Sequence, residues 1–166
     1  MWNNIGIPDQ VIDQNIPHFR ESEQKIKASG KTFAPSWNWA AFFFNIYWLI
    51  YRRCYKWAAI AYGGMVVASG VLTGITGILG VLMPIIIMVV SGLFGDSLYF
   101  YGIKEKIYKM KQAGSSDSEI LDKTRPSWKP VIIVAAIALG IGILTGILIA
   151  LLGAAIFAGF GSAMQY

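Results

Sequence analysis

Hydrophobic residues dominate two long stretches of this chain, and both stretches predict membrane-spanning helices. No Lys, Arg, Asp or Glu occurs from Trp57 to Gly95 or from Pro130 to Tyr166. Uncharged apolar runs of about 18 or more residues are typical of helices that cross a bilayer. A chain of 166 residues cannot bury two such stretches around one soluble core. We therefore predict an all-α integral membrane protein.

The first apolar stretch is too long for a single crossing and predicts a helical hairpin. As one helix, the 38 residues from 57 to 94 would measure about 57 Å, nearly twice the ~30 Å of a hydrocarbon core. The glycine-rich residues 70–80 are the best candidate for a turn. Two transmembrane helices follow, at about 55–72 and 77–101. Pro84 falls early in the second helix, where it either kinks the helix or marks a later start.

The second apolar stretch predicts one C-terminal transmembrane helix, within residues 131–166. Its run of about thirty apolar residues exceeds one perpendicular crossing, so we expect the helix to tilt or to fray at its glycine-rich end. Residues 102–130, before it, form a polar and basic loop in which Gly114 breaks the helix. Ser116 and Glu119 have the spacing of a capping box and predict a second short helix in this loop.

Residues 1–36 are mostly polar and predict a short amphipathic helix near the membrane surface. Its apolar positions fall near one helical face, between Pro17, which suits a first turn, and Gly30, which suits a helix end. The lone His18 has no Cys, Asp or Glu at metal-ligand spacing. We therefore expect His18 to be a surface residue, and we expect no metal site.

Residues 37–54 predict a short aromatic helix at the membrane interface. Its apolar part has about 14 residues, or roughly 21 Å of helix, and is too short to cross alone. Asn38, Asn45 and Arg52 recur every seven residues and share one narrow polar stripe. A deep re-entrant segment packed against the other helices stays open as an alternative, as does a fourth crossing. Side chains expected at headgroup depth, including those at the end of the hairpin, are Trp37, Trp39, Trp48, Arg52, Arg53, Tyr99 and Tyr101.

The distribution of positive charge predicts the orientation in the membrane. All 14 Lys and Arg fall within residues 20–31, 52–56 and 104–129. The positive-inside rule then places the N-terminus and the basic loop in the cytoplasm and the C-terminus outside, with three crossings. A fourth crossing would split the basic residues between the two sides. The chain thus divides into five predicted segments: 1–36, 37–54, 55–101, 102–130 and 131–166.

Composition and motifs argue against several classes of function. The net charge of +5 would suit nucleic acid, but no nucleic-acid-binding signature accompanies it, and we expect no nucleic acid partner. The sequence has no paired carboxylates in an apolar site, no metal-spaced His and Cys set, no nucleophile elbow and no phosphate loop. We therefore expect neither an enzyme nor a cofactor. Cys54 is the single cysteine and cannot form an internal disulfide, so we expect an idle thiol at the interface.

Small residues recur at every fourth position of the C-terminal helix, with a shorter example in the hairpin. This pattern lets a second helix approach closely. It serves either packing within the protein or an interface with another subunit. The positions are Ala138, Gly142, Gly146, Ala150, Ala154 and Ala158, with Gly70 and Gly74 in the hairpin.

Asp96 is the one ionisable residue close to a membrane segment. Acidic residues buried in bilayers usually serve ion or proton pathways, so Asp96 is a candidate for such a pathway. Its closeness to Tyr99, Tyr101 and Lys104 instead favours a wetted position at the interface.

Two blocks of the sequence resemble a known family. The first is Ser36-Trp-Asn-Trp-Ala-Ala-Phe-Phe-Phe with Tyr47-Trp-Leu-Ile-Tyr-Arg-Arg-Cys-Tyr, and the second is Gly92-Leu-Phe-Gly-Asp-Ser-Leu-Tyr-Phe-Tyr with Lys104-Glu-Lys-Ile. They resemble the signature of small bacterial membrane proteins grouped as domain of unknown function 2628. Asn45 departs from the pattern, because we expect a small residue such as Gly there. The resemblance implies a short aromatic segment, a hairpin and further helices in a bacterial inner membrane, and it carries no substrate, cofactor or catalytic residue.

These patterns together favour a structural, accessory or assembly subunit of a membrane complex. Its expected partners are the lipid bilayer and either other membrane subunits or a second copy of the chain. The alternative is a small homo-oligomeric channel or transporter. A transporter should show paired ionisable groups or broken helices at the bilayer midplane, and only Asp96 and Pro84 point that way.

Overall fold

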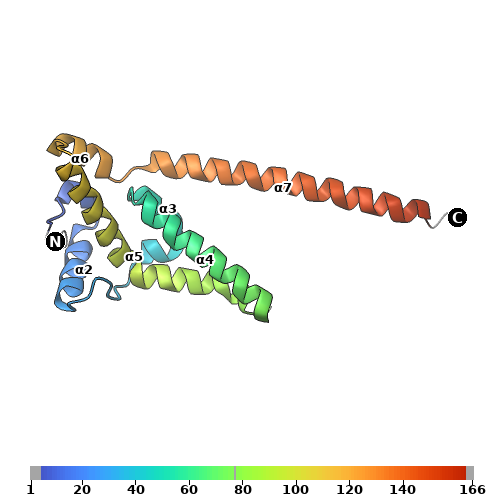
Figure 1. Ribbon diagram of the computed structural model, residues 1–166, viewed down its shortest axis with the longest axis horizontal. Helices are drawn as coiled ribbons and strands as arrows, with labels where there is room; N and C mark the ends of the chain where they lie inside the picture. Colours follow the sequence, from blue (N-terminus) through green and yellow to red (C-terminus); the bar gives the residue numbers. More distant parts are fainter. Residues whose placement is uncertain (1–4, 77, 164–166) are drawn as a thin grey trace. The chain divides into compact units, whose positions relative to one another are not determined.

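The computed structural model describes residues 5–76 and 78–163, except the side chains of residues 76–81 and 158–163, and this part is helical without β-strands. It forms two compact units, residues 1–128 and 129–166, each considered by itself below. Figure 1 labels most of the helices. Their bounds are α1 Asp9–Ile12, α2 Ile16–Ala28, α3 Trp39–Tyr51, α4 Tyr55–Thr76, α5 Ile78–Gln112, α6 Asp117–Thr124 and α7 Trp128–Ala163.

Three helices are long and apolar enough to cross a membrane, which confirms the predicted fold class. The candidate spans are Tyr55–Ile75 in α4, Leu82–Gln112 in α5 and the apolar part of α7 within Asp117–Phe157. α3 is a shorter apolar helix, also as predicted. The protein is therefore an all-α membrane protein with three candidate spanning helices and one short aromatic helix.

The hairpin of α4 and α5 has a tighter connection than the glycine pattern predicts. α4 continues through Gly70 and Gly74 to Thr76, and α5 already begins at Ile78, so the predicted turn over 70–80 is wrong for its first part. Glycine costs a helix only about 1 kcal/mol, whereas a backbone group left without a hydrogen bond in hydrocarbon costs several. Gly77 itself lies outside the described residues.

α5 is bent, and an extended segment from the N-terminal part of the chain crosses it at the bend (Figure 1). The backbone N–H groups of Ser36 and Asn38 donate to the carbonyls of Leu93 and Gly92, each at 2.8 Å. Helix carbonyls that accept bonds from outside the helix are a recognised cause of bending. Pro84 lies inside α5 and therefore does not mark the start of this helix.

α3 packs against α4 and α5 through one face. Ala41, Trp48, Leu49 and Ile50 are buried, while the aromatic rings on the other face stay exposed. The helix is interrupted at Asn45, whose φ of 46° and ψ of −119° are not helical. α3 is thus a kinked helix packed onto the hairpin. Its depth in the bilayer stays a prediction.

Two glycines of α5 permit the close approach of its neighbours. A Cβ placed on Gly95 would lie 2.6 Å from the Cβ of Ala41 in α3. A Cβ on Gly102 would lie 2.7 Å from Trp57 Cδ1 in α4. Real Cβ atoms do not approach this closely, so the packing of α3 and α4 on α5 requires glycine at both places.

The polar helices α2 and α6 pack against α5, and α1 packs against both of them. α2 occupies the range predicted between Pro17 and Gly30, and its Phe19 is buried. α1 was not predicted, because its four residues are too few to show a period. In α6 the hydroxyl of Ser116 accepts from the amide of Glu119, which confirms the predicted cap.

Substitution of Gly95 by Ala should destabilise the packing of α3 on α5. The added methyl overlaps Ala41, and overpacking of this kind costs about 1–3 kcal/mol. Thermal unfolding in detergent, followed by tryptophan fluorescence, should show a lower midpoint. Gly70→Ala is the matched control, because a Cβ there meets no atom within 4 Å, and its midpoint should stay equal or rise. Equal midpoints for the two variants would contradict the close approach.

Candidate functional site

The carboxyl of Asp96 in α5 is the centre of a buried polar cluster. Its exposed fraction is 0%. Oδ2 lies 2.8 Å from Ser22 Oγ, 3.2 Å from Ser36 Oγ and 3.0 Å from His18 Nε2. Oδ1 accepts from Asn38 Nδ2 at 2.5 Å. Four side chains from two other segments therefore meet at one carboxyl group.

The local structure of each segment explains this convergence. His18 and Ser22 are four residues apart on α2 and so share one helical face. Ser36 and Asn38 are two residues apart in extended backbone and so point to the same side, with Trp37 on the other. The helix α2 and the extended segment before α3 therefore each direct two polar side chains toward Asp96.

Asn38 has a double role that fixes its orientation. It is the N-cap of α3, and its Oδ1 accepts from the backbone N–H of Ala41 at 2.9 Å. The amide nitrogen is therefore left to donate to Asp96. The start of α3 is in this way tied directly to the acid in α5.

The arrangement is suited to holding segments together. Three of the four neighbours lie against Oδ2 and one against Oδ1, so the carboxyl group is surrounded by polar side chains from two other segments. The carboxyl group is shielded from solvent. To accept a proton from an external group, it would first have to break one of these hydrogen bonds. His18 is the cluster member with the most access to solvent, since 27% of its side chain is exposed. In the described part of the chain, no group of three His, Cys, Asp or Glu is placed to hold a metal ion.

A hollow of about 250 Å³ lies beside the cluster. His18 and Asn38 line it together with Arg52 and aromatic rings that include Trp48 and Tyr51. Polar groups of the cluster therefore form one wall of the hollow, and rings form much of the rest.

A family model with the description Protein of unknown function (DUF2628) matches residues 14–104, more than half of the chain. The chain belongs to this family. The matched range contains Asp96 and all four side chains that bond to it, so the cluster lies wholly within the family's domain. No match is found among curated proteins or among solved structures.

The two sequence blocks that carry the resemblance to DUF2628 meet in space. Ser36 and Asn38 stand at the beginning of the first block, and Gly92, Gly95 and Asp96 stand in the second. Their backbone and side-chain bonds join the blocks into one structural unit. The two blocks that resemble DUF2628 therefore contact each other in this chain.

The predicted wetted position of Asp96 is wrong, because its side chain is buried. His18 is partly exposed at the surface, and its Nε2 also lies within hydrogen-bond distance of Asp96. The contact between them leaves no motif in the sequence, because these residues are 78 positions apart. A role for Asp96 in an ion pathway stays a prediction.

Arg52 is buried, with 5% of its surface exposed. Its guanidinium donates to the carbonyl of Ile12 and lies 4.4 Å from the centre of the Phe19 ring and 5.3 Å from that of Tyr99. Cation–π contacts of this kind strengthen when water is excluded. Arg52 thus holds the N-terminal segment against α5 through contacts with protein groups, and its depth in the bilayer stays a prediction.

The other predicted headgroup residues divide into buried and exposed sets. Trp48 and Tyr99 are buried among aromatic rings of the protein, with their ring centres 5.9 Å apart. Trp37 and Trp39 remain exposed, and their depth in the bilayer stays a prediction. Tyr101, only partly exposed, stacks on Phe33, and Arg53 is considered with a second pocket below.

Glu23 and Lys104 form a second buried link between α2 and α5. Their charged atoms are 2.8 Å apart, and the side chains are 7% and 8% exposed. Burial alone would raise the pKa of Glu23, but the hydrogen bond and charge of Lys104, with those of Lys27, lower that pKa below its ordinary value. Glu23 is therefore ionised at neutral pH, and the pair stabilises the docking of α2.

Cys54 is a buried thiol, and its depth in the bilayer stays a prediction. Its Sγ lies 3.9 Å from the carbonyl oxygen of Tyr99. Burial raises the pKa of Cys54 to about 12. The thiol is therefore protonated at neutral pH, and a protonated thiol is a poor nucleophile.

The predicted small-residue positions fall on the two units. Gly70 and Gly74 lie in α4, where an added Cβ would meet no atom within 4 Å. In α7 the helix is continuous, so the positions from Ala138 to Ala154 follow one another along one face. The side chain of Ala158 lies outside the described residues. What these faces contact stays a prediction.

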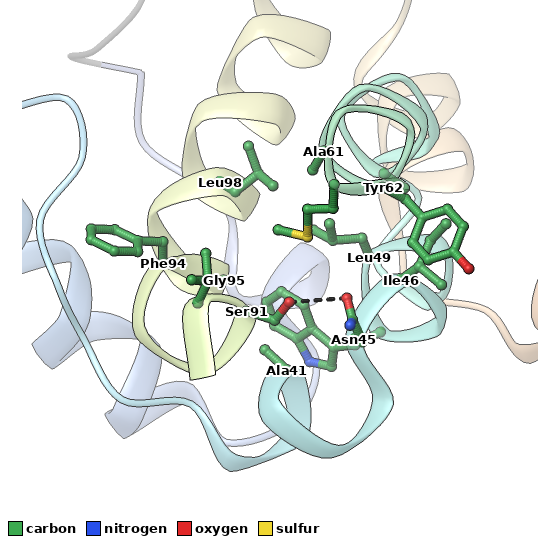
Figure 2. Close-up of a pocket in the computed structure, with 14 residues that line it drawn as sticks. Ala41, Asn45, Ile46, Leu49, Ala61, Tyr62, Ser91, Phe94, Gly95 and Leu98 are labelled. Carbon is green, nitrogen blue, oxygen red and sulfur yellow. Dashed lines mark hydrogen bonds between the residues drawn. The ribbon is translucent and has the colours of Figure 1, made fainter. Parts of the chain in front are cut away.

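A small apolar cavity of about 60 Å³ lies between α3, α4 and α5, and Figure 2 shows the residues around it. One polar contact crosses its wall, where Ser91 Oγ donates to Asn45 Oδ1 at 2.9 Å (Figure 2). Asn45 is also the residue with the positive φ that interrupts α3. The small residue that the DUF2628 pattern leads us to expect here has a physical reason, because glycine tolerates this backbone conformation best.

Removal of the Asp96 carboxyl should release α2 from α5. Asp96→Ala leaves three buried side chains and the partly exposed His18 without their partner, and we expect a loss of about 3 kcal/mol or more in unfolding free energy. Hydrogen exchange should rise in α2 and in residues 34–38. Asp122→Ala is the control, because Asp122 is exposed, and it should change neither quantity. Normal protection of α2 in Asp96→Ala would contradict the role of the cluster.

The backbone at position 45 should prefer glycine to alanine. Asn45→Gly and Asn45→Ala both remove the bond to Ser91, but only alanine meets a steric penalty at a φ of 46°. We expect Asn45→Ala to be less stable than Asn45→Gly by about 1–2 kcal/mol in thermal unfolding. At Ala59, an exposed position inside α4, the order should be reversed, with Ala59→Gly less stable than the parent. The same order at both positions would refute the strain at Asn45.

Proposed function

We propose that this DUF2628 protein is a structural, accessory or assembly subunit of a membrane complex. The observation that carries the proposal is the use of Asp96. Its carboxyl is fully buried, and side chains from α2 and the segment before α3 take up its acceptor positions. Asp96 lies within the candidate span of α5 and is thus engaged in joining parts of the chain, so little of it is left for catalysis or transport.

The channel or transporter alternative would require an accessible ionisable group along a polar path. The pocket between α3, α4 and α5 is small and apolar, and its polar contact is the bond of Asn45 with Ser91. An ion that reached Asp96 would have to displace the side chains that already contact its carboxyl group. These features favour the accessory role over transport.

The orientation and location follow the charge pattern. We infer a bacterial cytoplasmic membrane, with the N-terminus and residues 102–130 inside and the C-terminus outside, because all basic residues then face one side. α7 would present its small-residue face to a helix of another subunit or of a second copy. In-membrane cross-linking of the intact protein, followed by mass spectrometry of the purified adduct, tests this association. A stoichiometric partner is the expected result.

The association should depend on one face of α7. Gly146→Leu places a large side chain on the face where small residues repeat, and it should dissociate the complex without unfolding the protein. Native mass in mild detergent reports the assembly, and circular dichroism reports the fold. Gly140→Leu is the control, because position 140 faces away from that repeat, and it should leave the mass unchanged. If both variants keep the parental mass, α7 does not form the interface through this face.

A further inference from the structure

A second pocket lies where α4 begins and the last part of α5 passes it. Its volume is about 340 Å³. Its lining includes the four cationic side chains of Arg53, Lys56, Lys106 and Lys109, and a single acid, Glu105. The pocket therefore carries an excess of positive charge.

Glu105 gathers two of these cations at one oxygen. The ammonium groups of Lys56 and Lys109 lie 2.8 and 2.7 Å from the same Oε1 atom, and Trp57 Nε1 donates to Oε2 at 2.9 Å. One carboxylate thus offsets only one of the two positive charges that it brings together. Both lysine side chains are also largely exposed, so they are free to turn toward a second anion.

The other two cations have no carboxylate partner among the described residues. Lys106 Nζ donates to the carbonyls of Lys123 at 2.7 Å and of Arg53 at 3.3 Å. The Arg53 guanidinium donates to the Tyr55 hydroxyl at 3.2 Å, and its Nε is buried without a hydrogen-bond partner. Neutral oxygens hold these two cations in place but do not balance their charge.

The position of the pocket selects the kind of anion. Tyr55 is the first residue of the candidate span in α4, so the pocket is next to the predicted membrane interface, where phospholipid headgroups lie. Tyr55 and Trp57 are aromatic residues with polar atoms, which favour this depth. Beyond them α4 exposes a run of apolar side chains such as Ile60 and Val67, against which acyl chains can pack.

We propose that this pocket binds the phosphate of an anionic phospholipid headgroup, with the acyl chains along α4. Basic pockets between transmembrane helices are suited to such headgroups, and each cation near the surface contributes to the attraction. The proposal concerns charges and positions that the Asp96 cluster does not use. It is independent of whether the protein is an accessory subunit.

Lipid binding to the full chain in detergent, measured by native mass spectrometry, tests the site. The probes are phosphatidylglycerol and zwitterionic phosphatidylcholine with identical acyl chains. We expect phosphatidylglycerol to bind more tightly to the parent. Lys56→Gln with Lys109→Gln should weaken phosphatidylglycerol binding about 30-fold, the effect of two cations near an anionic headgroup. Both residues are largely exposed, so the fold should persist, and circular dichroism checks this.

Removal of the negative charge of Glu105 should have the opposite effect and strengthen lipid binding. Glu105→Gln frees the ammonium groups of Lys56 and Lys109, so phosphatidylglycerol should bind about fivefold more tightly. Glu21→Gln removes the same charge from an exposed pair on α2 and should have no such effect. Lys25→Gln with Lys31→Gln is the matched control for the double lysine variant, since both lysines are exposed and outside the pocket.

Three results would overturn the proposal. The first is equal affinity of the parent for the two lipids. The second is an equal effect of the pocket variants and their matched controls, which would indicate general charge attraction. The third is binding of inorganic phosphate in a lipid-free titration while phosphatidylglycerol does not bind, which would assign the pocket to a soluble anion.

Discussion

A carboxylate can leave water only if hydrogen-bond donors replace the water that it loses. Asp96 meets this condition with two donors from α2 and two from the extended segment before α3. The position of α2, the path of residues 34–38 and the start of α3 all depend on it. In the bend of α5, the carbonyls of Gly92 and Leu93 accept amides from the same extended segment. One buried acid therefore sets much of the geometry of residues 14–104.

Gly95 and the buried Arg52 also fix the position of α3, in addition to Asp96. Gly95 lies one residue before Asp96 and lets α3 approach at the distance that the bonds to Asn38 require. Arg52, at the end of α3, donates to the carbonyl of Ile12 and lies against Phe19. Both ends of α3 are thus attached, one through the acid and the other through the cation. The polar stripe seen in the sequence, with Asn38 and Arg52 at its ends, faces protein.

The sequence was sufficient for the helices and insufficient for their contacts. Length and hydropathy determine a spanning helix directly, so the three long helices and α3 were predicted. The turn in the hairpin was misplaced because glycine weakens helices in water more decisively than in hydrocarbon, where an unbonded backbone group costs more. The cluster at Asp96 was missed because hydrogen bonds across 78 residues leave no periodic signal. The sequence shows only the two blocks, Ser36 to Asn38 and Gly92 to Asp96, that resemble the family. It does not show that these blocks are close in space.

The order of the bonding groups along the chain has a consequence for biosynthesis. The His18 and Ser22 donors precede Asp96 by 78 and 74 residues, so they leave the ribosome first. At about 5–20 residues per second, roughly 4–16 s pass before the acid follows. The donors spend this interval in water, where they need no partner. The acid, in contrast, lies within the candidate span of α5, and its partners have already been synthesised when it follows. Synthesis in this direction therefore makes hydrogen-bond partners available to the carboxyl group before α5 is complete.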